Sequence, residues 1–133
     1  PLMNDAAAAV AFADWQARVR SSWPHVRVLG IDVSGIDTEP ALGHTMTVRA
    51  YFDLGGLSDT DVAVEVVTGT AGPDGDLTDT AVTRMRFVGN GDGHRFQAEV
   101  PLTRAGSLGY TVRAVPRHPM LASGAEMGLV VFP

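Results

Sequence analysis

The segment TMTVRAYFDL, residues 45–54, alternates apolar and polar side chains without a break. Its apolar members are Met46, Val48, Ala50, Phe52 and Leu54. The segment 61–69 repeats the pattern, with Val62, Val64 and Val66 on one side. Because successive side chains of a strand point to opposite faces, both segments predict strands that bury one face of a sheet. A second layer must cover that face.

Other short segments rich in β-forming residues predict further strands at 26–33, 80–89, 94–102, 109–116 and 129–133. The connectors GGLSDT (55–60), AGPDGDLTD (71–79) and GNGDG (89–93) are typical of loops and hairpins. Alternating βα units would need more helices than the sequence offers. We therefore expect an immunoglobulin-like antiparallel β-sandwich of about seven strands, preceded by one N-terminal α-helix.

The helix is expected from Asn4 to Ser22, where Pro24 prevents its continuation. Phe12, Trp15 and Val19 have the spacing of one apolar helix face, which must pack on the sandwich. The pattern divides the chain into a helical segment, 1–24, and a β-sandwich domain, 25–133.

The charge of the chain argues against nucleic acid as a partner. Ten arginines and no lysine stand against fifteen acidic residues, giving a net charge of -5, and the arginines are scattered. No apolar run approaches the roughly 20 residues that span a bilayer, and the start lacks the features of a signal peptide. The absence of cysteine suits the cytoplasm. Since the chain opens on Pro1, we expect it to be processed or cut from a longer protein.

No constellation of catalytic or metal-binding residues stands out. The histidines lie on separate segments, without the spacing of a helical metal pair: His25, His44, His94 and His118. No serine sits in a G-x-S-x-G elbow. The aspartates of the 71–79 loop lack the ligand pattern of a calcium loop, and GNGDG lacks the lysine of a phosphate loop. We therefore predict no catalytic, cofactor-binding or metal-binding residue.

The aromatic residues Trp15, Trp23, Tyr51 and Tyr110 offer an alternative, because exposed aromatic rings stack on sugars. Trp15 already belongs to the apolar face of the helix. Trp23, next to Pro24, is expected to fill the junction between helix and sheet. Exposed coplanar rings would favour sugar binding, whereas buried rings would favour a packing role.

Three stretches carry a family resemblance: ADWQARVRSSWPHVRV, LGGLSDTDVAVEVVTG and above all GYTVRAVPRHPMLASGAEMGLV. They resemble the C-terminal region of bacterial α-glucan (glycogen or maltodextrin) phosphorylases of the shorter, actinobacterial type. The chain departs from the family at Thr68-Gly69, where an aromatic residue is expected before the glycine.

The resemblance implies a parent enzyme that cleaves α-1,4-glucans with inorganic phosphate to give glucose 1-phosphate. Such enzymes hold pyridoxal phosphate on a lysine of a catalytic core that precedes this region. This chain has no lysine. The resemblance therefore implies that it is an inactive accessory domain that holds no cofactor. The expected partner is the catalytic core, which the helix of 1–24 would join to the sandwich, or a second subunit. The alternative is a module that binds α-glucan.

The sequence Pro-Arg-His-Pro, 116–119, predicts a rigid exit from a strand. Pro116 cannot donate to the sheet, and Pro119 biases the preceding residue towards an extended conformation. We expect Arg117 and His118, held on that exit and exposed to solvent, to contact the rest of the enzyme rather than act as acid and base. Together with Trp15, Trp23 and Tyr110 they are the candidate docking or glycan-contact residues.

Overall fold

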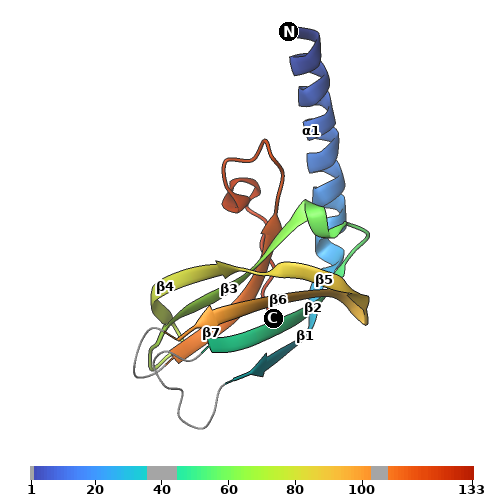
Figure 1. Cartoon of the computed structure of the whole chain (residues 1–133). Helices are drawn as coiled ribbons and strands as arrows, with labels where there is room; N and C mark the ends of the chain where they lie inside the picture. Colours follow the sequence, from blue (N-terminus) through green and yellow to red (C-terminus); the bar gives the residue numbers. More distant parts are fainter. Residues whose placement is uncertain (1, 36–44, 103–107) are drawn as a thin grey trace.

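Figure 1 shows a computed structural model in which a long helix stands at one end of two β-sheets. The structure describes residues 2–35, 45–102 and 108–133. Its helical elements are α1 (Leu2–Ser22) and the short 3-10 helices η1 (Trp23–His25), η2 (Asp59–Asp61) and η3 (Gly124–Met127). Its strands are β1 (Val26–Ser34), β2 (Thr45–Leu54), β3 (Val62–Ala71), β4 (Leu77–Arg84), β5 (Arg86–Gly91), β6 (Gly93–Pro101) and β7 (Leu108–Pro116).

The strands form a four-stranded sheet in the order β1-β2-β6-β5 and a three-stranded sheet in the order β4-β3-β7. Within each sheet, all neighbouring strands pair in the antiparallel direction. The expected mainly β class is therefore confirmed: two antiparallel sheets with seven strands follow one N-terminal helix. The immunoglobulin-like designation within this class stays a prediction.

One hydrophobic core lies between the sheets and extends to the base of α1. The alternating residues of β2 and β3 face it, as the period of two predicts, and they meet residues of β6 and β7 there. Its fully buried side chains include Met46, Val48, Phe52, Val62, Val64, Val66 and Val112. From α1, Trp15 and Val19 complete this core, which confirms the predicted apolar helix face.

The structure corrects two of the expected strands. The segment 80–89 is not one strand, because the chain leaves β4 at Arg84 and begins β5 in the other sheet at Arg86. Met85 between them is buried, and its N–H donates to the carbonyl of Val64 at 2.8 Å. An apolar residue that fills the core at a crossing between sheets is indistinguishable in the sequence from one within a strand.

The segment 129–133 is the second correction. Only Val131 pairs with the sheet, through an isolated antiparallel bridge to Ala114 of β7. Gly128 precedes this segment with a φ of 69°, a left-handed conformation that favours glycine and turns the chain out of η3. The chain thus meets the edge of β7 at one point instead of running along it.

Candidate functional site

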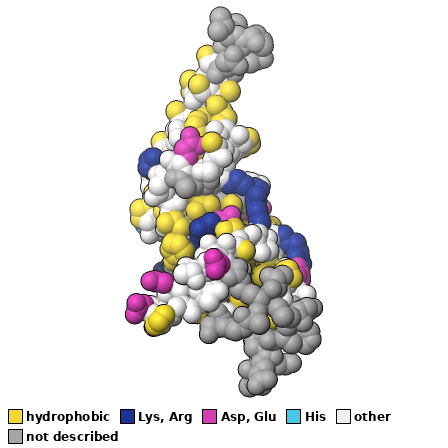
Figure 2. Space-filling model, turned by 90° about the vertical axis from the view of Figure 1, so that its left-hand side faces the viewer, with side chains coloured by type: hydrophobic (Ala, Val, Ile, Leu, Met, Phe, Trp, Pro, Cys, Tyr) yellow, Lys and Arg dark blue, Asp and Glu magenta, His cyan; other side chains and the backbone are white. Residues whose placement is uncertain are grey.

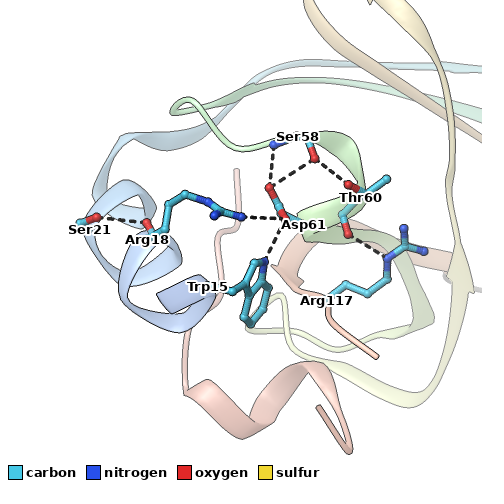
Figure 3. A network of polar contacts seen from close by, with 7 residues as sticks. All are labelled: Trp15, Arg18, Ser21, Ser58, Thr60, Asp61 and Arg117. Atoms are coloured by element: carbon cyan, nitrogen blue, oxygen red, sulfur yellow. Dashed lines mark hydrogen bonds and ion pairs between the residues drawn. The ribbon is translucent and has the colours of Figure 1, made fainter. Parts of the chain in front are cut away.

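Asp61, the last residue of η2, fixes the base of α1 to the sandwich. Its Oδ1 atom accepts a hydrogen bond of 2.9 Å from the indole Nε1 of Trp15 (Figure 3). The guanidinium Nη2 of Arg18 lies 3.7 Å from the same oxygen. Trp15 is only 5% exposed. One carboxylate therefore holds two side chains from adjacent turns of the helix.

Hydrogen bonds within the loop before β3 hold the carboxylate of Asp61 in place. Ser58 and Asp61 form a capping box: the Ser58 N–H donates to Asp61 Oδ2 at 2.9 Å, and the Asp61 N–H donates to the Ser58 carbonyl at 3.0 Å. Partial burial acts to raise the pKa of Asp61. The hydrogen bonds from Ser58 and Trp15 and the charge of Arg18 outweigh that effect, so the pKa lies below its ordinary value.

The strand exit of β7 meets the same loop. β7 ends at Pro116, as expected, and the N–H of Arg117 donates to the carbonyl of Asp61 at 2.8 Å. The Nε of Arg117 donates to the carbonyl of Thr60 at 3.4 Å (Figure 3). Arg117 thus joins the exit of β7 to η2.

His118 packs against α1. Its ring centroid lies 4.6 Å from that of Trp15 and 4.9 Å from that of Phe12. Its Nδ1 accepts a hydrogen bond of 3.1 Å from the N–H of Met120. Both side chains were expected to be exposed to solvent, and the structure shows them half-buried. The short segment after β7 places Arg117 against η2 and His118 against α1.

Trp23 and Tyr110 lie in different surroundings. Trp23 is buried at the base of α1, where it fills the space between helix and sheet. Its Nε1 has no hydrogen-bond partner among the described residues. Tyr110 is 39% exposed near the start of β7. At about 3.3 Å per residue of strand, it lies roughly 20 Å from the exit. The structure thus gathers all the candidate residues except Tyr110 at one end of the sandwich.

The sequence interpretation missed Asp61, although a signal for it exists. Ser58 and Asp61 have the S-x-x-D spacing of a capping motif. That motif predicts a local turn but not the partner from α1, which is 46 residues away from Asp61 in the chain.

The N-terminal half of α1 extends beyond the sandwich (Figure 1). Residues 6–11 are all exposed, and Val10 is 62% exposed. Figure 2 shows apolar side chains along this projecting part. We call residues 6–11 the helix arm. Its side chains therefore lie largely in solvent.

Other features carry no site. Over the described ranges, no group of three or more His, Cys, Asp or Glu side chains is placed to hold a metal ion. His44 lies outside the described residues. None of the described helices is long and apolar enough to cross a bilayer.

The geometry defines a class of protein: a small antiparallel β-sandwich domain that carries a rigidly anchored N-terminal helix. Residues 23–133 match the family model described as the glycogen phosphorylase C-terminal domain, and the chain belongs to that family. The match begins at η1, immediately after α1.

Two similar proteins are the glycogen phosphorylases of Mycobacterium tuberculosis (strain CDC 1551 / Oshkosh) and Mycobacterium bovis. Each is 40% identical over 127 residues, which cover 94% of this chain. The chain spans only 15% of the length of these relatives. No solved structure matches the chain.

Proposed function

We propose that this chain is a non-catalytic accessory domain that docks on the catalytic core of an α-1,4-glucan phosphorylase through the helix arm. The observation that carries the proposal is the contrast within α1. Its C-terminal half is anchored by Trp15, Asp61 and His118, whereas every residue of the helix arm, 6–11, is exposed.

An apolar helix arm needs a partner. A helix that stays in solvent normally carries polar residues on its free sides. The helix arm has only alanine and one valine, so its burial against another surface would stabilise it. In a C-terminal domain, α1 is the element through which the chain arrives from the catalytic core. A second subunit is the alternative partner.

The proposed parent reaction is cleavage of α-1,4-glucan by phosphate to give glucose 1-phosphate, in the cytoplasm. Pyridoxal phosphate would supply the acid-base chemistry of its phosphate group. This chain has no lysine, so its residues do not fit the covalent attachment of that cofactor. The cofactor belongs to the catalytic core in this proposal.

The burial of the aromatic rings supports docking over glucan binding. Both tryptophans are buried in the junction, and Tyr110 stands apart from them. Tyr51 is half-buried, and its hydroxyl donates to Asp32 Oδ2 at 3.2 Å. Of the four rings only that of Tyr110 is exposed, so they do not form a surface of several exposed rings on which a sugar chain could stack.

The substitution Val10→Asp in the full-length enzyme tests the proposal. It should loosen the domain and speed proteolysis between the core and α1, because a charge would be buried at the contact. The control is Val88→Asp, on a position of β5 that is also exposed (45%, against 62% for Val10). Equal resistance of both variants to protease contradicts docking through the helix arm, and retention of the domain on immobilised glucan favours the rival.

A further inference from the structure

A groove of about 610 Å³ lies on the outer face of the β4-β3-β7 sheet, away from the core. Ala63 and Glu65 of β3 and Val115 of β7 form part of its floor. These residues alternate with Val62, Val64 and Ala114, which face the core. The C-terminal segment after η3 forms the opposite wall through Leu129, Val130 and Phe132. Of the residues that line the groove, Arg117 also belongs to the junction described above.

The groove carries an excess of positive charge. Its ionisable lining residues are Arg84, Arg113, Arg117 and Glu65, three positive charges against one negative. Arg84 and Arg113 flank Glu65 in one cross-strand row. Glu65 Oε1 accepts from Arg113 Nε at 2.9 Å, and within the described part of the chain Arg84 forms no ion pair. The excess of positive charge in the groove contrasts with the net charge of -5 of the whole chain.

The wall beside the arginines is apolar and partly exposed. Val130 is 44% and Phe132 is 52% exposed, while Leu129 packs partly against the core. Figure 2 shows arginine side chains beside apolar ones over the sandwich. Such a surface suits a partner that presents both carboxylates and apolar side chains.

We propose that the groove binds an acidic segment with apolar flanks from the catalytic part of the same enzyme chain. This inference rests on the proposed function, because it places a second contact beside the first. Arg117 belongs both to the groove and to the junction that anchors α1, so a core docked on the helix arm lies beside the open end of the groove. The loop 117–128 and α1 also rise from the same end of the sandwich (Figure 1).

The spacing of the arginines favours a polypeptide over a small anion. Arg113 and Arg117 are separated by about 13 Å along an extended chain, at about 3.3 Å per residue. A single phosphate group bound to the arginines would leave the apolar wall of Leu129, Val130 and Phe132 uncovered. An extended segment can pair with Arg84 or Arg117 while its apolar side chains lie against Leu129 and Phe132.

Chemical modification of arginine by phenylglyoxal, mapped by mass spectrometry, tests this inference. Arg84 should react freely in the 133-residue chain and at least about fivefold more slowly in the full-length enzyme, because the acidic segment covers it. Arg27 of β1, whose side chain is 70% exposed on the other sheet, is the control and should react equally in both. High salt should restore the reactivity of Arg84, because it screens the ion pairs.

Equal reactivity of Arg84 in the two proteins overturns the inference. If the helix arm is nevertheless protected from amide hydrogen exchange in the full-length enzyme, the proposed docking stands and only the groove contact fails. Protection of Arg84 by inorganic phosphate in the 133-residue chain assigns the groove to a small anion and also overturns it. The substitution Arg84→Glu gives a second readout: it should speed exchange at residues 129–132 in the full-length enzyme but not in the 133-residue chain.

Discussion

The indole N–H of Trp15 donates to the carboxylate of Asp61, a residue 46 positions later in the chain, at 2.9 Å. This bond joins the middle of α1 to the loop that starts β3. Because Arg18 and His118 contact the same corner, the direction of α1 is fixed relative to the sandwich. The C-terminal half of α1 is therefore held against the sandwich in a defined direction.

The first prediction concerns the pH dependence of this corner. The folded pKa of Asp61 lies below the unfolded value of about 3.9, so the folded state holds the proton less well. Its stabilising effect is present above that value and is lost as the pH falls through the folded pKa. Asp61→Asn should lower the free energy of unfolding by about 1–2 kcal/mol at pH 7. The difference from wild type should shrink below about pH 4.

Urea unfolding of the 133-residue chain at pH 7 and pH 3, followed by tryptophan fluorescence, measures this difference. Asp59→Asn, in the same short helix but without a bond to Trp15, is the control. A deficit for Asp61→Asn that is as large at pH 3 as at pH 7 would show that the charge of the carboxylate is unimportant.

His118→Ala should destabilise the 133-residue chain by about 0.5–1.5 kcal/mol, because its ring contacts Phe12 and Trp15. Arg117→Ala should cost at most about 0.5 kcal/mol, since the long 3.4 Å hydrogen bond from its side chain is exposed. Thermal unfolding of the single variants separates the two. Identical melting of wild type and His118→Ala would mean that the ring does not brace the helix.

Much of the fold follows from the sequence because the buried face of each sheet has a period of two. Met46, Phe52 and Val64 occupy the core as that period predicts. The sequence does not predict that the chain crosses from one sheet to the other at Met85. A buried apolar residue at the crossing looks the same in the sequence as a buried residue within one continuous strand. At the candidate site, proline chemistry predicted the end of β7, but no local signal pairs Asp61 with Trp15. Contacts between distant segments depend on the packed fold.

The second sheet of the sandwich depends on Val64, which is 1% exposed. Val64→Asp should bury an unpaired carboxylate in the core and lower the free energy of unfolding by several kcal/mol. Val82→Asp, on an exposed position of β4, should have little effect. Circular dichroism melting curves of both variants decide the matter, and a Val64→Asp curve that coincides with wild type would refute the register of β3.

The absence of lysine gives a chemical prediction. The 133-residue chain should neither bind pyridoxal phosphate covalently nor release glucose 1-phosphate from maltodextrin and phosphate. Borohydride reduction followed by mass spectrometry detects any Schiff base, and a coupled assay detects turnover. Either signal above a blank would contradict the assignment of all chemistry to the catalytic core.

Amide hydrogen exchange in the helix arm tests the central claim most directly, because it reports whether residues 6–11 are covered in the enzyme. In the 133-residue chain these amides should exchange quickly, since the exposed end of a helix frays at little cost. In the full-length phosphorylase they should exchange at least about tenfold more slowly, because the catalytic core covers the arm. Equal exchange rates in the two proteins would contradict docking through α1.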